Sequence, residues 1–135
     1  MIELLDVGGE GRLRQAINLN TSYIKTLGPN KGEPIPRLMI GRADDIPLPC
    51  ESVRVVVMER TPLMRHTALE IHRVVVPGGF VILRHHAGIT DPHSAAAQIL
   101  GTPLSTTSMK IGSQAVKQSV FRKRTHREPG KLFHS

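Results

Sequence analysis

The sequence predicts an α/β fold in which a mostly parallel β-sheet is covered by helices and ends in an antiparallel hairpin. Three observations support this class. Short apolar segments of strand length recur through the first 60 residues, the hydrophobic period becomes helical after Pro62, and two β-prone segments flank Gly112-Ser113 near the C-terminal end. Strands that alternate with helices favour parallel pairing. A chain of 135 residues predicts one domain, 1–135.

Four strands are expected before Pro62. Residues 2–7, IELLDV, are almost entirely apolar and stop at Gly8-Gly9, which is typical of a strand buried on both faces. Shorter strands are expected at 14–20 and 37–41, separated by a proline-rich loop. Residues 53–58, VRVVVM, are nearly all β-branched and give the clearest strand pattern of the chain.

The second half begins with a helix. Apolar residues at helical spacing predict a helix from Leu63 to Val75, which must end before Pro77. Gly78 and Gly79 permit a sharp reversal into a fifth strand, FVILRHH. The next helix is expected over 91–100, with Asp91 as N-cap and proline at its first position. Residues 104–111 and 115–124 complete the expected hairpin.

The charge is concentrated at the C-terminal end. The formal net charge is +7, and residues 110–135 hold seven Lys or Arg against one acid, Glu128. This basic end is either a solvated strand end or a surface that steers towards nucleic acid and other polyanions. One cysteine, Cys50, precludes an internal disulfide and fits a reducing, cytoplasmic location. No leader peptide and no segment of membrane-spanning length is apparent.

Three segments, in this order, resemble the class I S-adenosylmethionine-dependent methyltransferases. ELLDVGGEG, residues 3–11, is similar to that family's first motif, an apolar strand followed by Asp-x-Gly-x-Gly-x-Gly. ADDIPLPCESVRVVVM, residues 43–58, resembles its third loop and fourth strand. ALEIHRVVVPGGFVIL, residues 68–83, resembles the helix and Pro-Gly-Gly segment before its fifth strand. The resemblance implies a Rossmann-like, methyltransferase-like sheet, with the hairpin as the family's sixth and seventh strands.

The resemblance also implies a cofactor, S-adenosylmethionine, at the carboxyl ends of the parallel strands. Glycines after a strand let a ligand approach the backbone, and polar side chains at neighbouring strand ends receive its ribose and adenine. The cofactor-binding residues carried over from the family are Asp6, Gly8, Gly9, Gly11, Asn20, Ala43, Asp44 and Asp45. Glu59, after the fourth strand, is the candidate base or substrate acceptor, and its alternative role is an ion pair with Arg60 or Arg65.

The sequence departs from the family pattern in several places. In an ungapped alignment from Asp6, only Gly8 matches, since Glu10 and Arg12 stand where the other glycines belong; one deletion restores Gly8, Gly9 and Gly11. Only four residues, 12–15, are left for the family's first helix. Asn20, or Asn18 in a shifted register, stands in place of its ribose-binding acid. The missing helix predicts a poorly covered sheet face, an exposed apolar patch, and hence a dimer or a protein partner.

The remaining polar candidates have structural alternatives. Asp6 either supports the cofactor loop or caps its own turn. His85 and His86 end the fifth strand and His93 opens the next helix, but adjacent strand residues point to opposite faces, so we expect no metal site. One of these histidines could still act as a proton acceptor in the cleft. Cys50 and Arg73 are expected to be structural.

Two functions therefore stay open from the sequence. The first is a methyltransferase that binds S-adenosylmethionine and acts on a small substrate near Glu59. The second is a catalytically inactive protein of the same fold, a binding or scaffold protein that acts through a protein partner, a homodimer or its basic C-terminal surface, with nucleic acid as a less favoured partner.

Overall fold

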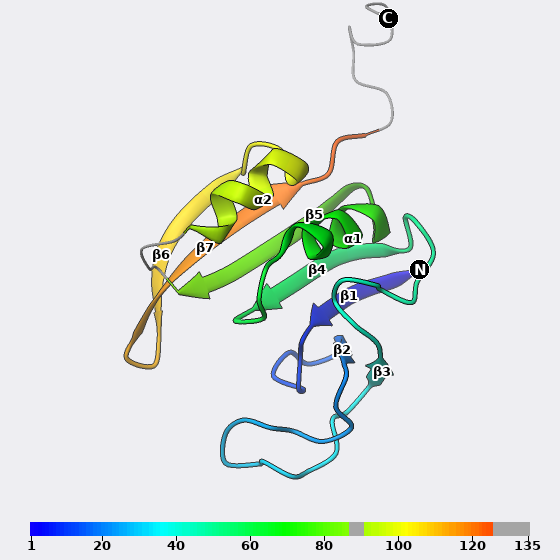
Figure 1. The fold of residues 1–135 in the computed structure, drawn as a ribbon, viewed down its shortest axis with the longest axis vertical. Coiled ribbons are helices and arrows are strands. Elements are labelled where there is room, and N and C mark those ends of the chain that lie inside the picture. The colour runs from blue at the N-terminus through cyan, green and yellow to red at the C-terminus, as the bar shows by residue number, and fades with distance from the viewer. Residues whose placement is uncertain (87–90, 126–135) are drawn as a thin grey trace, which may run out of the picture.

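The structure of the chain is a computed structural model that describes residues 1–86 and 91–125 (Figure 1). Seven strands and two helices are found in these residues. The strands are β1 (Ile2–Val7), β2 (Ile17–Asn20), β3 (Leu38–Ile40), β4 (Val53–Glu59), β5 (Val75–His86), β6 (Ser105–Ile111) and β7 (Gln114–Arg122). The helices are α1 (Arg65–Val74) and α2 (Pro92–Leu100). No helix in the described part of the chain is long and apolar enough to cross a membrane.

The strands form one mixed sheet in the order β3-β2-β1-β4-β5-β7-β6. The first five strands of this order pair in parallel, whereas β7 pairs antiparallel with both β5 and β6. The expected Rossmann-like sheet with a C-terminal hairpin is thus confirmed. The strand order reverses between β1 and β4, which is where open α/β sheets place their ligand sites.

Both helices lie on the same face of the sheet (Figure 1). The core is formed between them and alternate residues of the central strands, with Leu5, Val56, Val81 and Phe121 each at most 1% exposed. Alternate residues of a strand point to opposite faces, so one face carries this core and the other has no helix over it among the described residues. The loss of the first helix, expected from the sequence, therefore leaves one sheet face open.

The loop between β3 and β4 is fixed to the helical face by Arg73. Its guanidinium donates to the backbone oxygens of Ile46 and Leu48 at 2.9 and 2.8 Å and pairs with Glu70 at 2.7 Å. The pairing with Glu70 is the main cause that raises the pKa of Arg73 further above its usual value. Arg73 thus has the structural role expected from the sequence, and it also contacts the exposed Cys50 at 3.7 Å.

Two strands are shorter than predicted. The second was expected from residue 14 but begins at Ile17, because the chain turns at Gln15, where φ is 71°. The third was expected over 37–41 but covers only Leu38–Ile40, after Arg37 with φ of 47°. Backbone in this left-handed region cannot continue a ladder, so each strand starts after the turn.

The Pro-Gly-Gly segment is not the turn that the sequence predicts. Helix α1 ends at Val74 and β5 begins at once at Val75, so that segment lies inside the strand. It forms a bulge: Val53 pairs with Val75, but Val55 already pairs with Phe80. The bulged residues no longer pair with β4, and one of their backbone N–H groups finds another partner: Gly78 N donates to Lys123 O at 2.8 Å. The prediction failed because glycine and proline favour a bulge as readily as a turn.

Helix α2 and the hairpin agree with the sequence. The Asp91 carboxylate accepts from the backbone N–H groups of His93 and Ser94, as an N-cap should, and pairs with Lys117 on β7 at 2.6 Å. Lys117 is the main cause that lowers the pKa of Asp91 to about 2. The basic C-terminal end predicted over 110–135 is described only as far as residue 125, and the rest lies outside the described residues.

The bulge gives a testable prediction about Gly79. A Cβ at this position would lie 2.5 Å from the backbone oxygen of Arg54 and 2.9 Å from that of Val76, so Gly79→Ala should lower the free energy of unfolding by about 1–3 kcal/mol. Gly28→Ala is the control, because that glycine has a φ of +78° and open space around it, and should cost about 1 kcal/mol. Urea denaturation measures both. An equal or smaller loss at Gly79 would contradict the bulge geometry.

Candidate functional site

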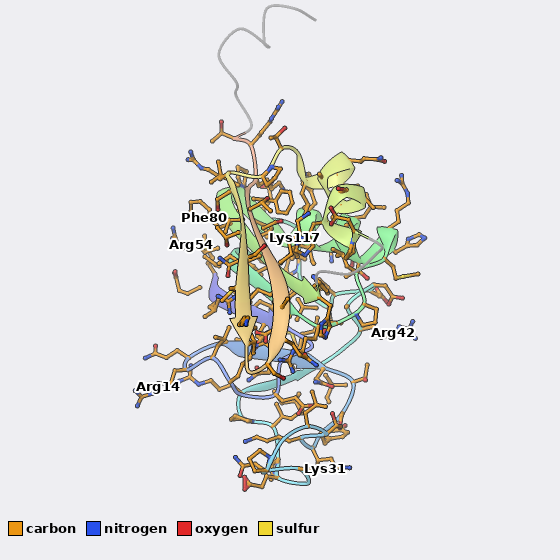
Figure 2. The ribbon with its side chains drawn as sticks, turned by 90° about the vertical axis from the view of Figure 1, so that its left-hand side faces the viewer. Arg14, Lys31, Arg42, Arg54, Phe80 and Lys117 are labelled. Atoms are coloured by element: carbon orange, nitrogen blue, oxygen red, sulfur yellow. The ribbon has the colours of Figure 1, made fainter. Side chains whose placement is uncertain are left out.

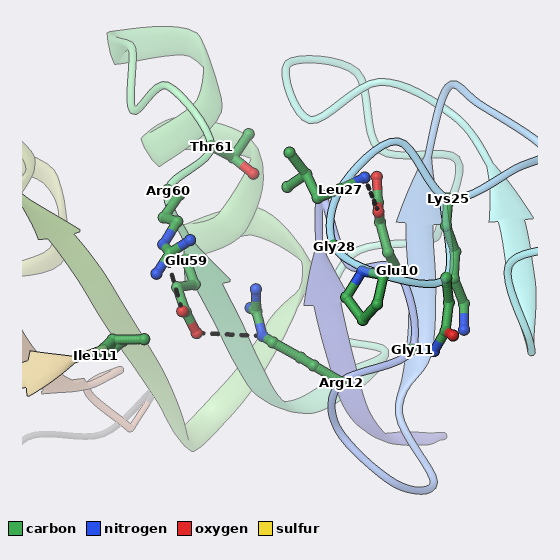
Figure 3. Close-up of a pocket in the computed structure, with 13 residues that line it drawn as sticks. Glu10, Gly11, Arg12, Lys25, Leu27, Gly28, Glu59, Arg60, Thr61 and Ile111 are labelled. Atoms are coloured by element: carbon green, nitrogen blue, oxygen red, sulfur yellow. Dashed lines mark hydrogen bonds and ion pairs between the residues drawn. The ribbon is translucent and has the colours of Figure 1, made fainter. Parts of the chain in front are cut away.

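A cavity of about 540 Å³ opens at the carboxyl ends of β1 and β4, where the strand order reverses (Figure 3). The loop after β1 forms its floor and contributes Gly8, Gly11 and Arg12 to the lining. Its walls come from the end of β4 and from the loop after β2, and they include Glu59, Arg60, Thr61, Lys25 and Leu27. The position of the cavity follows from the topology, since the loops after β2, β1 and β4 all leave the same ends of adjacent parallel strands.

The glycines of the loop are required by close approach of the protein to itself. Gly8 has a φ of +78°, and a Cβ there would collide with the Thr61 side chain, which is hydrogen-bonded to Val7 O at 3.3 Å. A Cβ at Gly9 would lie 2.5 Å from an oxygen of Asp6 and would clash with Asn18. The loop is consequently packed tightly against β2 and the end of β4, and only its outer surface faces the cavity.

Arg12 bridges the two buried carboxylates of the site. Its Nη2 lies 2.7 Å from Asp6 Oδ1. Its Nε lies 3.2 Å from Glu59 Oε2, a contact that Figure 3 shows. Arg60 and Arg84 lie farther from Glu59, at 3.8 Å each. Glu59 is only 9% exposed, so its charge is balanced by these three guanidinium groups. The ion pair with Arg60 was anticipated, whereas the shorter contact with Arg12 was not.

Asp6 is fully buried beneath the loop. Burial is the largest effect on it and raises its pKa to about 6, against the opposing charge of Arg12. Its Oδ2 and the Oδ1 of Asn18 are both buried without a hydrogen-bond partner in the described residues, and both lie beside Gly9. A carboxylate oxygen without a donor disfavours the charged form, so this arrangement agrees with the raised pKa of Asp6.

The side chain of Asn20, which was expected to bind a ribose, instead makes hydrogen bonds within the protein. Its amide nitrogen donates to Gly9 O at 3.1 Å, and its oxygen accepts from Ser22 N at 2.9 Å. Glu10 provides a carboxylate instead. It accepts from the backbone of Thr26 and Leu27 at 3.0 and 3.2 Å, which turns it away from the floor of the cavity. Burial opposes the charge on Glu10, but these hydrogen bonds outweigh it and lower the pKa below its usual value.

A second cavity of about 280 Å³ adjoins the first. The two share Gly8, Glu10, Leu27 and Thr61 in their linings. The second is also lined by Asn20 and Ala43, two of the residues that the sequence assigns to cofactor binding. Asp44 and Asp45 are exposed and line neither cavity, and Asp44 pairs with Arg42 at 2.9 Å. The structure therefore places five of the predicted residues at the carboxyl ends of the parallel strands: Gly8, Gly11, Asn20, Ala43 and Glu59. Asp6 and Gly9 are buried behind them.

A buried chain of hydrogen bonds supports Thr61 from below. His85 Nε2 lies 2.8 Å from Thr61 O, His85 Nδ1 lies 2.9 Å from His93 Nε2, and His93 Nδ1 lies 2.8 Å from Ser119 Oγ. A carbonyl only accepts, so His85 donates to Thr61 and accepts from His93. Burial lowers the pKa of both rings, that of His93 to about 4. His85 and His93 are thus neutral structural groups, while His86 is exposed on the opposite face.

Sequence reasoning missed Arg12, Lys25 and Thr61, and gave no role to the pairing of His85 with His93. Arg12 could have been found, because an arginine in the place of a loop glycine, six residues after a buried aspartate, is within reach of its carboxylate. Lys25 and Thr61 approach the glycine loop only through tertiary folding, and their spacing in the sequence carries no such signal.

No family model matches the sequence, and no curated protein is significantly similar to it. Solved structures do match its fold. A SAM-dependent methyltransferase from Methanosarcina mazei has a TM-score of 0.69 at 11% identity, covering 92% of this chain and 93% of that one. A SAM-dependent methyltransferase from Thermotoga maritima has 0.66 at 13%, covering 90% and 82%. A 16S rRNA (adenine(1408)-N(1))-methyltransferase from Catenulisporales acidiphilia, solved with SAM, has 0.64 at 10%, covering 95% and 88%. At these identities the likeness shows a methyltransferase fold.

The buried Asp6 predicts a distinctive pH dependence. Because its pKa is raised from 3.8 to about 6 by folding, the folded protein binds more protons than the unfolded chain, and stability falls as pH rises from about 4 to 7. A shift of about two pKa units corresponds to at most about 3 kcal/mol. Asp6→Asn lacks this loss, so its free energy of unfolding should rise relative to wild type by up to that amount over the same range.

The comparison uses the difference between variant and wild type, because His93 contributes the opposite slope to both proteins: its lowered pKa makes stability rise with pH between about 4 and 6.5. Asp44→Asn is the control, because a hydrogen bond with Arg42 is the main cause that lowers the pKa of Asp44, so the effect of this change should be constant above about pH 5. Denaturation at a series of pH values measures all three proteins. A difference between Asp6→Asn and wild type that stays flat would refute the raised pKa.

Proposed function

We propose that the chain is an S-adenosylmethionine-dependent methyltransferase that acts on a small substrate. The observation that carries the proposal is the cavity of about 540 Å³ over Gly8 and Gly11, at the reversal of strand order in a methyltransferase fold. When bound there, the cofactor would supply an electrophilic methyl group on a sulfonium. The cavity with its neighbour of about 280 Å³ has the extent that an elongated nucleoside ligand needs.

The residues of the two cavities fit such a ligand in kind. We assign the backbone of Gly8 and Gly11 to the amino-acid portion and the cavity around Asn20 and Ala43 to the nucleoside. Glu10 lines both cavities, and its carboxylate accepts from three donors of Thr26 and Leu27. An ionised carboxylate has about four acceptor sites, so we assign the remaining one to a ribose hydroxyl, because the Asn20 amide holds the loop. Ala43 lines the nucleoside cavity and Asp45 follows it by two residues, so we assign the adenine amino group to Asp45, or to Asp44 if it leaves Arg42, once the loop closes on the ligand. Asp6 and Gly9 act indirectly, by fixing the loop through Arg12 and through close packing.

The substrate would lie against the wall formed by Glu59 and Arg60. Methyl transfer depends mainly on aligning the nucleophile with the methyl carbon and the leaving sulfur. Glu59 Oε2 is held by Arg12 at 3.2 Å, which fixes the carboxylate in place to accept a hydrogen bond or a proton from the nucleophile. Lys25 lines the far side of the same cavity and adds positive charge there.

We expect the protein to act in the reducing environment of the cytoplasm, as its single exposed cysteine suggests.

A second candidate function rests on the open sheet face. A central parallel sheet is normally covered on both sides, so a protein partner or a second copy would bury this surface. In that case the chain serves as a binding or scaffold protein, with or without catalysis, or contacts nucleic acid through its basic end. The two functions are compatible, because the cavity lies at the strand ends and the open face lies along the strands.

Calorimetric titration with S-adenosylhomocysteine tests the cofactor proposal. Wild type should bind in the micromolar range, and Glu10→Gln should bind about tenfold more weakly, since it loses a charge-assisted acceptor at the junction of the cavities. Glu33→Gln, which changes an exposed glutamate on the loop between β2 and β3, is the control and should bind like wild type. Melting temperatures of all three proteins without ligand separate lost binding from lost folding. Absence of heat and of thermal stabilisation at millimolar ligand would refute the proposal.

A further inference from the structure

The sheet face opposite the helices carries an apolar strip across four strands. Leu4 pairs with Val55, Val55 with Phe80, and Ile82 with Val120, so these five side chains stand on adjacent strands β1, β4, β5 and β7. None of them belongs to the core cluster on the helical side. We call these five residues the open strip. Figure 2 shows Phe80 on the side of the sheet away from the two helices.

The open strip is unusual for strands of this kind. β1 and β4 pair only with parallel neighbours, and parallel strands are almost always covered on both faces. The four less exposed members of the strip are half-buried by their neighbours alone, and Phe80 is 37% exposed. Three inter-strand spacings of about 4.8 Å make the strip about 14 Å wide, which matches the 10–12 Å diameter of one helix. The strip is therefore wide enough for a single helix.

The charges around the strip select the kind of helix. Arg122 pairs in register with Phe80, and Arg84 lies four residues after Phe80 on the same face of β5, where it also lies 3.8 Å from Glu59. Arg14 and Arg54 also lie on the side away from the helices (Figure 2). Glu3 neutralises Arg54, to which it is paired at 2.8 Å, so the excess of positive charge on this side comes from the other arginines. A helix whose apolar stripe is flanked by Asp or Glu would match this arrangement.

A second copy of the chain fits the same surface poorly. A two-fold interface places the same patch of both subunits together, so the arginines of one copy would face those of the other. Like charges brought together on burial are unfavourable. We propose that the open strip binds an amphipathic helix with acidic flanks from another polypeptide. This interaction does not depend on the cofactor proposal, because none of the five strip residues lines either cavity.

The first test uses two synthetic peptides of about 18 residues with the same leucine stripe, one flanked by glutamate and one by lysine. Fluorescence anisotropy measures their binding to the chain. The glutamate peptide should bind saturably and at least about tenfold more tightly than the lysine peptide. Phe80→Glu should weaken it about tenfold or more. Leu69→Glu on α1 should not, although Leu69 is 39% exposed and Phe80 37%. Circular dichroism confirms that both variants are folded.

Charge is tested separately with Arg122→Glu, which should weaken the glutamate peptide and improve the lysine peptide. Arg65→Glu, an exposed arginine on the helical side, is its control and should change neither. Sedimentation equilibrium tests whether a second copy of the chain covers the open strip instead. We expect wild type to be monomeric without peptide. Absence of binding to the glutamate peptide, equal binding of both peptides, or a wild-type dimer that Phe80→Glu dissociates would each overturn the proposal.

Discussion

The bridge that Arg12 forms between Asp6 and Glu59 is the contact on which the site depends. Proteins of this architecture normally cross between adjacent parallel strands through a helix, whereas here β1 and β2 are joined by residues 8–16 without one. A short loop has little surface of its own to bury, so an ion pair must fix it. Arg12 does this by joining the end of β1 to the end of β4 at 2.7 and 3.2 Å. Asp6 tolerates its burial because of this partner, and Glu59 is held at the cavity wall by it.

The absence of that helix has opposite consequences on the two sides of the molecule. At the strand ends, the loop folds down against β2 and Thr61 and leaves room above it, which becomes the cavity. Along the strands, nothing among the described residues replaces the helix, and the open strip remains. None of the three connections from β1 to β4 contains a helix, and this lack accounts for both a ligand site with a rearranged acceptor and a surface suited to an additional helix. The function of the cavity and the occupancy of the open strip are independent questions.

Much of the fold follows from the sequence, because its signals are local. Three elements are specified by a few adjacent residues each. These are the strand Val53–Glu59 with its β-branched residues, helix α2 with its N-cap Asp91, and the hairpin that turns at Gly112. The bulge after Val75 was misread, since whether Pro-Gly-Gly turns or bulges is decided by pairing with β4 and β7. Three residues that the sequence assigns to the site, Gly8, Gly11 and Glu59, line one cavity, and their roles in binding stay predictions. The hydrogen bonds of Asn20 and Glu10 could not be predicted, because they depend on loop residues distant in sequence.

The central claim is that the cavity over Gly8 and Gly11 is a ligand site. The most direct measurement is a nitrogen-15 NMR titration of the chain with S-adenosylhomocysteine. Our account predicts that the amide signals of Gly8, Gly11 and Thr61 shift together and saturate, while those of Phe80 and Ile82 on the open strip stay in place. Unchanged signals around the cavity at saturating ligand, or shifts confined to the open strip, would contradict it.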